Sequence, residues 1–355
     1  MKKHTMVGFC LALAVLLIGV PVRASAGGAA EEPDPDQYVV SITMLSIPVY
    51  QEAPRAFMEY VEEASGGRIV FEDFLMGTLG SDDEVMEMVY HGEIDITTGQ
   101  IDAGLSSFAP SVQALSAPFM FSGWQSFVAL MDTPFFGDLQ QQVLSESNGN
   151  LRILAAMKGS ARRTFTVNGP VRTPDDLVEH NVRMRTVEAP MHMALWEALG
   201  ASTVAIPSEE RYMAAQTGLA DGFEGGLGSA IEYDLIEFTR YTAMTDHIVS
   251  GHYFVANEQW YQSLPPDLQA IIDEGARIAE EVQNRHVPQA SEEALEIMRD
   301  RGVEIIELTP DEVAQWREIA EPVGLEILAE EVDMDFMRRL QEAVAEVEAG
   351  MVGSQ

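Results

Sequence analysis

Alternating strand-like and helix-like segments from Tyr38 onward most constrain how this chain can fold. β-rich runs occupy Tyr38–Leu45, Arg68–Phe74 and Ile94–Thr97, and helical patterns between them occupy Glu52–Ser65 and Ser81 to Gly92. Because helices join successive strands in this pattern, the β-α-β-α-β rhythm predicts an α/β domain with a largely parallel sheet.

The same rhythm returns in a second segment. Strands are expected at Thr164–Asn168, Val182–Thr186 and Val204–Pro207, with helices at Ala189–Leu199 and Ser208–Gln216. Beyond about residue 250 the pattern predicts one helix from Pro266 to Arg285, a second from Ser291 to Arg301, and a third opened by the capping box at Thr309–Glu312. With 355 residues and no Gly/Ser-rich linker, we expect two halves joined by a pair of crossing strands.

The N-terminus has the pattern of a secretory signal peptide spanning residues 1–26. Lys2, Lys3 and His4 precede an apolar run of 14 residues, and Ala24-Ser25-Ala26 is a small-x-small cleavage site. Residues 27–37 form a short leader whose composition predicts disorder. The only cysteine, Cys10, lies inside the signal, so the mature chain is expected to lack disulfides, thiol nucleophiles and thiolate metal sites.

The chain is strongly acidic, with 57 Asp and Glu against 21 Lys and Arg and a formal charge of −36. Such a field repels nucleic acid and anionic membrane surfaces, so neither is expected as a partner. Adaptation to high salt explains the excess best, because short Debye lengths weaken the repulsion. A cationic ligand is the weaker explanation.

Familiar catalytic and metal patterns are missing from the sequence. The seven histidines show no HxxxH or HExxH spacing, and there is no GxSxG or phosphate-loop motif. Carboxylates are so common that no pair stands out for acid–base chemistry. We therefore expect no catalytic residue, no metal and no cofactor.

Basic residues persist in one otherwise acidic stretch. In the strand-like V-R-M-R-T run, Arg183 and Arg185 should share a face, and a guanidinium on a rigid strand can grip a carboxylate bidentately. Arg163 follows the same logic. The alternative is pairing with a surface carboxylate, and the pattern alone favours it. The glycine-dense Asp221–Gly226 stretch allows close approach to a ligand, although an ordinary turn explains it better.

Several motifs in fixed order carry a family resemblance. They are G-T-L-G-S-D-D-E at Gly77–Glu84, A-P-F-M-F at Ala117–Phe121, T-P-D-D-L at Thr173–Leu177, V-R-M-R at Val182–Arg185, Q-T-G-L-A-D-G-F-E at Gln216–Glu224, and N-E-Q-W-Y-Q-S-L-P-P-D-L-Q at Asn257–Gln269. From about Tyr38 to about Asp333 the chain resembles the periplasmic solute-binding proteins of TRAP transporters, of the DctP (C4-dicarboxylate-binding) type.

The resemblance implies an α/β fold of two domains that close over a ligand cleft, with a long helix in the C-terminal part. Domain I would comprise residues 38–160 plus 251–290, and domain II residues 161–250 plus 291–350. The family's carboxylate-gripping arginine falls on Arg185 and a second arginine on Arg163. The other expected ligand-binding residues are Gln100, Glu188, Ser208, Glu224 and Gly225. Gly225 replaces an Asn found in many members and Ser208 an aromatic residue, so the identity of the acid stays open.

By the same resemblance the protein is expected to be a periplasmic receptor and not an enzyme. It would bind a small organic acid, possibly a sugar acid, without a cofactor, and deliver it as a monomer to the TRAP membrane permease. The alternatives are an exported sensor domain and an enzyme acting on acidic sugars.

Overall fold

The computed structural model describes residues 37–75, 77–101, 103–186, 190–207, 210–249 and 251–352. The expected signal peptide and nearly all of the expected leader lie outside these residues. Two of the expected site residues, Glu188 and Ser208, also lie outside them. Within this part of the chain, no helix combines the length and the apolar composition that a membrane span needs.

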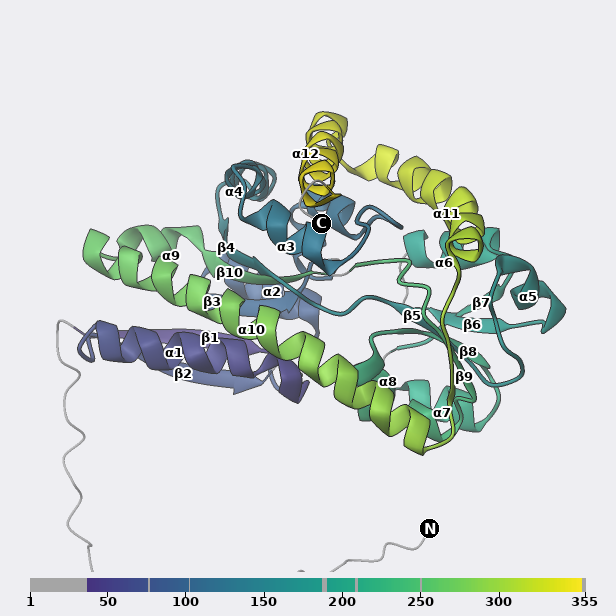
Figure 1. Ribbon diagram of the computed structural model, residues 1–355. Coiled ribbons are helices and arrows are strands. Elements are labelled where there is room, and N and C mark those ends of the chain that lie inside the picture. The colour runs from purple at the N-terminus through teal and green to yellow at the C-terminus, as the bar shows by residue number, and fades with distance from the viewer. Residues whose placement is uncertain are drawn as a thin grey trace, which may run out of the picture. The chain divides into compact units, whose positions relative to one another are not determined.

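The first sheet begins with the predicted β-α-β-α-β unit (Figure 1). Strands β1 (Tyr38–Met44), β2 (Ile69–Leu75) and β3 (Ile96–Gln100) pair in parallel, connected by helices α1 (Glu52–Ala64) and α2 (Asp82–His91). Helix α2 starts with a capping box, in which Ser81 Oγ accepts from the Glu84 N–H and the Glu84 carboxylate accepts from the Ser81 N–H. The parallel part of the prediction is therefore confirmed for these strands.

The rest of the first sheet is antiparallel, which the strand rhythm did not predict. Strand β10 (His252–Asn257) inserts between β3 and β4 (Leu151–Met157) and runs antiparallel to both. The sheet order is β2-β1-β3-β10-β4. A strand from late in the chain thus fills the middle of a sheet built by the first half, and the sheet is mixed.

A second sheet has the order β11-β9-β5-β8-β6-β7 and is also mixed. Strand β5 is antiparallel to β8 and β9, whereas β6 is parallel to β7 and β8. Its strands are β5 (Arg163–Thr166), β6 (Arg183–Thr186), β7 (Ser202–Ala205), β8 (Gly222–Gly225), β9 (Tyr241–Ala243) and β11 (Glu304–Ile306). The glycine-dense stretch expected to be a turn is in fact the buried strand β8.

The chain passes between the two sheets at three places. One crossover leads from β4 to β5 and a second from β9 to β10, and an antiparallel bridge between Ala161 and Val249 holds them together. The Arg162 N–H also donates to the Ile248 carbonyl at 2.8 Å. The third passage is helical.

That helix is α10 (Pro266–Asp300), 35 residues long (Figure 1). The prediction of separate helices ending at Arg285 and starting at Ser291 is wrong, because α10 continues through Pro288. A proline inside a helix removes one backbone hydrogen bond. Both flanks of the helix are nevertheless anchored in cores: Ile272 packs with the first sheet, and Met298 packs with the second.

The remaining helices cover the sheets and close the chain. They are α3 (Trp124–Met131), α4 (Phe135–Glu146), α5 (Pro174–Glu179), α6 (Pro190–Ala198), α7 (Arg211–Gln216), α8 (Leu227–Glu232), α9 (Glu258–Ser263), α11 (Pro310–Glu331) and α12 (Met334–Val352), with short 3-10 turns such as η1 (Pro48–Tyr50) and η3 (Pro110–Ser116). The predicted capping box at Thr309 and Glu312 opens α11. Helix α12 returns to the first half of the chain, where Phe336 packs in a core with Phe135 of α4.

Candidate functional site

Arg185 is the most deeply buried cation described, with 2% of its surface exposed. It lies on β6, and its Nε donates to the Ile206 carbonyl at 2.7 Å. Burial and, after it, the nearby charge of Arg211 lower the pKa of Arg185 to about 9, against an opposing effect from Glu224. Because burial and a like charge both disfavour the charged form of Arg185, an anion placed beside the guanidinium would stabilise it strongly.

Arg183, two residues earlier on β6, has a different environment. Its side chain is 46% exposed and faces Asp221 at 3.5 Å. It is therefore the surface-paired arginine that the pattern alone favoured for both positions. The two side chains make a natural comparison, because they share a strand and differ in burial.

Further cations gather around Arg185. The Arg211 guanidinium lies over the Tyr233 ring, 4.6 Å from its centre. Arg162 Nη1 lies 4.0 Å from Glu224 Oε1, and its charge also depresses the pKa of Arg185. In a chain with 57 acidic and 21 basic residues, the gathering of two half-buried arginines beside a buried one is unexpected from composition. We call Arg162, Arg185 and Arg211 the arginine cluster.

Glu224 on β8 is the buried counter-charge of this cluster. His192 Nδ1 lies 2.8 Å from its Oε1, and His247 Nε2 lies 3.0 Å from its Oε2. Burial alone would raise the pKa of Glu224, but the charges of His192 and Arg162 and both imidazole hydrogen bonds hold it well below 4.5. Because an ionised carboxylate only accepts, both histidines donate to it. Both carboxylate oxygens thus already have protein partners.

Arg163 and Tyr50 approach the cluster along the crossover from β4 to β5. Arg163 Nη1 donates to the Ala161 carbonyl at 2.8 Å, and its Nε lies 2.7 Å from Asp246 Oδ1 in an ion pair whose N–H is not aligned with the oxygen. The Tyr50 hydroxyl lies 2.6 Å from Ser160 Oγ. Burial raises the pKa of Tyr50, while the charges of Arg162 and Arg163 oppose that effect. A residue of η1 thereby meets the crossover beside two arginines.

Lys158 adds a cation at the start of the same crossover. Its Nζ lies 5.4 Å from the centre of the Trp124 ring. Burial, followed by the charge of Arg163, lowers the pKa of Lys158. The Trp124 ring, which also packs edge-on against Phe127, thus faces this ammonium group.

The remaining expected site residues lie on two strands. Gly225 ends β8 opposite Arg163 of β5, with a φ of +153°. A Cβ placed there would lie 2.8 Å from Ser229 Oγ, so a larger residue would crowd α8. Gln100 ends β3 opposite His252 of β10. The His252 ring lies 4.1 Å from the Tyr50 ring, which connects this end of the first sheet with the crossover.

Sequence reasoning missed several members of this site. Arg211, Tyr50, Lys158, His192 and His247 come from separate elements, and their convergence depends on the tertiary fold. The sequence feature that could have identified the basic members is the scarcity of Lys and Arg. In so acidic a chain, each of these few residues is a candidate for a specific role. Among the described residues, no group of three or more His, Cys, Asp or Glu is arranged to hold a metal ion.

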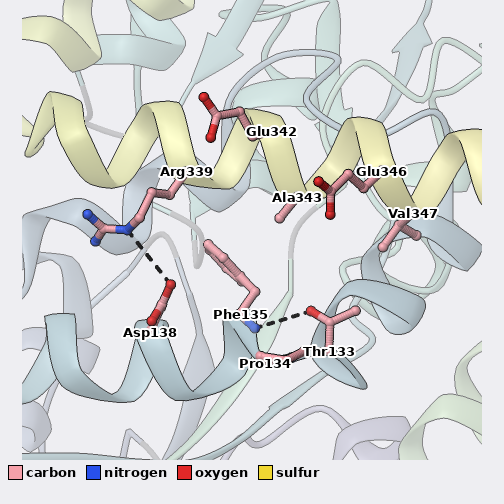
Figure 2. Close-up of a pocket in the computed structure, with 9 residues that line it drawn as sticks. All are labelled: Thr133, Pro134, Phe135, Asp138, Arg339, Glu342, Ala343, Glu346 and Val347. Atoms are coloured by element: carbon pink, nitrogen blue, oxygen red, sulfur yellow. Dashed lines mark hydrogen bonds and ion pairs between the residues drawn. The ribbon is translucent and has the colours of Figure 1, made fainter.

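A groove of about 530 Å³ lies elsewhere, between α4 and α12 (Figure 2). Phe135, Ala343 and Val347 supply apolar walls, and Arg339 Nε lies 3.8 Å from Asp138 Oδ2 across it. None of its lining residues belongs to the arginine cluster. We therefore place the candidate site at the cluster, where buried charge is concentrated, and not at this groove.

Comparison with known proteins gives the family. A family model described as "Bacterial extracellular solute-binding protein, family 7" (DctP) matches residues 40–331. The chain belongs to this family. It is a solute-binding receptor of the TRAP-transporter type, a family of periplasmic binding proteins and not of enzymes.

Individual relatives agree with this assignment. The C4-dicarboxylate-binding periplasmic protein DctP of Rhodobacter capsulatus is 24% identical over 295 residues, covering 82% of this chain and 85% of the relative. A TRAP periplasmic solute-binding protein from Ochrobactrum anthropi, with its C-terminus bound in the ligand-binding pocket, has a TM-score of 0.81 at 25% identity, covering 88% of this chain and 97% of that one. The Sulfitobacter protein with bound β-D-galacturonate has a TM-score of 0.76 at 22% identity, covering 86% and 99%. The predicted α/β fold with a long late helix is confirmed.

Proposed function

We propose that this receptor binds a small organic acid, such as a sugar acid or a dicarboxylate, with the ligand carboxylate at the arginine cluster. The observation that carries the proposal is the burial of Arg185 beside the like charges of Arg162 and Arg211. Like charges buried together are costly, and an anion between them relieves both the repulsion and the lost hydration. The chemistry of the bound sugar acid in the Sulfitobacter structure, and the name of the Rhodobacter relative, support the same ligand class.

The expected residues have distinct roles in this proposal. Arg185 grips the carboxylate, and Arg163 adds a second charge-assisted contact. Gln100 and Glu224 accept from ligand hydroxyl groups, Glu224 through the lone pairs that its histidines leave open. Gly225, Ser208 and Glu188 complete the wall of the site.

Binding would close two domains over the ligand. Residues 38–160 plus 251–290 form one domain in this proposal, and residues 161–250 plus 291–350 form the other. Ligand that contacts both domains favours the closed form, because only that form makes both sets of contacts. The closed receptor then delivers its ligand to the permease subunits, acting as an exported monomer with no catalysis, cofactor or metal.

A thermal-shift screen of refolded protein tests the proposal. Refolding removes ligand carried over from expression, and the library holds C4 dicarboxylates, hexuronates, aldonates, neutral polyols and zwitterionic solutes. Ligand at 100 times its Kd stabilises the folded state by about 2.7 kcal/mol, which raises the melting temperature visibly. A rise confined to one carboxylate class supports the proposal. A rise only with neutral or zwitterionic compounds contradicts it.

A further inference from the structure

The middle of α10 holds the backbone of Lys158 from both sides. Gln283 Nε2 donates to the Lys158 carbonyl at 2.7 Å, and Asn284 Oδ1 accepts from the Lys158 N–H at 2.9 Å. Two adjacent side chains of one helix thus satisfy both polar main-chain groups of a single residue. We call this pair of hydrogen bonds the Lys158 clamp.

Lys158 is the first residue beyond the ladder of the first sheet. The last pair of β4 with β10 is Met157 with His252, so Lys158 has no strand partner. Buried main-chain N–H and C=O groups need other partners, and the clamp provides them. The crossover is next tied down by the Ala161–Val249 bridge. Its position between these two anchors determines where Ser160, Arg162 and Arg163 lie.

Gln283 stands at a position where the helix pattern calls for an apolar residue. Ile272, Ala276 and Ala279 form a buried stripe at helical spacing, and Gln283 continues it with 1% of its surface exposed. A buried amide destabilises the fold unless it is hydrogen-bonded. An apolar side chain would fill this position without that requirement, so the amide points to a specific task.

Asn284 is itself held by a third α10 residue. Its side chain is hydrogen-bonded to the Glu280 carboxyl. Since Asn284 Oδ1 accepts from Lys158, its Nδ2 donates to Glu280, which fixes the orientation of the amide. Burial and the charges of Asp132 and Glu281 together raise the pKa of Glu280 to about 7, against opposing effects from the Asn284 hydrogen bond and Arg277.

We propose that Gln283 and Asn284 are positioning residues of the anion site, which act through the Lys158 backbone on the crossover segment that carries Ser160, Arg162 and Arg163. The effect on ligand affinity rests on the proposed function, whereas the effect on the crossover does not. Losing the clamp would release the start of the segment, and the remaining anchors would be the Tyr50 contact with Ser160, the Ala161–Val249 bridge and the Arg162 N–H bond to Ile248. Its arginines would then sample positions away from the carboxylate, which weakens binding without removing any cation.

The test compares Gln283→Met and Asn284→Ala with the control Gln289→Ala, an exposed α10 residue outside the clamp. Hydrogen–deuterium exchange followed by mass spectrometry reports on peptides covering residues 157–163, and calorimetry measures the Kd for D-galacturonate and for succinate. We expect faster exchange in this segment and at least tenfold weaker binding in both clamp variants, with neither change in the control.

Asn284→Asp tests whether the contact between residue 284 and Glu280 controls exchange of the crossover. A general loss of stability would not give the pH dependence expected for this variant. Aspartate keeps the acceptor for the Lys158 N–H and loses the donor to Glu280. At low pH the two carboxyls can share a proton, and this variant should retain slow exchange at residues 157–163. As the pH rises and the pair loses that proton, repulsion between the two carboxylates should speed exchange relative to the unaltered protein at the same pH.

Two outcomes are separable. Wild-type exchange of residues 157–163 in both Gln283→Met and Asn284→Ala overturns the clamp, whatever the ligand results. Failure of the unaltered protein to bind either acid counts against the proposed ligand class, and the exchange data still decide the clamp. Faster exchange with unchanged affinity shows that the crossover does not position the anion site, which also overturns the proposal.

Discussion

Replacing Glu280 by glutamine should stabilise the protein at pH 8 and have little effect at pH 5. Burial and the charge of Asp132 raise the pKa of Glu280 from its usual 4.5 to about 7. A carboxyl whose pKa is higher in the folded state than in the unfolded state stabilises the folded protein when it is protonated. This stabilisation is fully present at a pH below the unfolded-state pKa, and it is lost as the pH rises through 7. The difference of about 2.5 between the two pKa values corresponds to about 3.5 kcal/mol, at about 1.4 kcal/mol per unit. Local relaxation and partial exposure reduce this value, so we expect a change of about 1–3 kcal/mol.

Urea denaturation at pH 5, 6, 7 and 8 measures this change. The free energy of unfolding of Glu280→Gln relative to the unaltered protein should rise by about 1–3 kcal/mol between pH 5 and pH 8. Glu281→Gln is the matched control, because the neighbouring side chain is 62% exposed and pairs with Arg277. An effect of Glu280→Gln that is the same at pH 5 and pH 8, or a control that shows the same pH dependence, would refute the reasoning.

Three further predictions concern stability. Glu224→Gln should lower the free energy of unfolding at pH 7 by about 2–4 kcal/mol in urea denaturation, because it breaks a buried charge network. Since the pKa of Glu224 is lowered in the folded protein, the difference in stability between the variant and the unaltered protein should narrow as the pH falls below about 4. A cost that does not change with pH would contradict this prediction. Gly226→Ala should lower the free energy of unfolding by about 1–3 kcal/mol, because a Cβ there would lie 2.4 Å from Ser160 Cβ. The control Gly228→Ala lies in a helix with open space around it, and it should be neutral or stabilising. Equal effects of the two variants would show that the contact with Ser160 relaxes freely. Thr309→Ala should cost about 0.5–2 kcal/mol through loss of the α11 cap, and no change in melting temperature would show the cap to be dispensable.

Local patterns predicted the parts of the fold that local physics determines. The β1-α1-β2-α2-β3 unit and the caps at Ser81 and Thr309 follow from periodicity and from short-range hydrogen bonds. The insertion of β10 into the first sheet depends on a strand far away in the chain, so no local pattern signals it. The continuity of α10 through Pro288 has the same origin, because its two ends are held by different cores.

The candidate site also combines residues that local patterns marked with residues whose placement depends on the tertiary fold. Strand periodicity marked Arg183 and Arg185 alike, yet one is surface-paired and the other buried, and their burial is set by the elements that cover β6. Glu224 could be named from the sequence, but its two histidines come from α6 and from the crossover after β9. All the ligand-binding assignments, the domain boundaries, the signal peptide and the monomeric state stay predictions.

Titration calorimetry on refolded protein is the most direct test of the carboxylate site at Arg185. The acid that gives the largest thermal shift would be titrated into the unaltered protein, Arg185→Met and Arg183→Met. Removing one partner of a buried charge pair costs about 2–5 kcal/mol, so Arg185→Met should weaken binding by at least about 30-fold. Arg183→Met, which alters an exposed arginine on the same strand, should bind within about twofold of the unaltered protein. Binding by Arg185→Met that matches the unaltered protein would contradict the account.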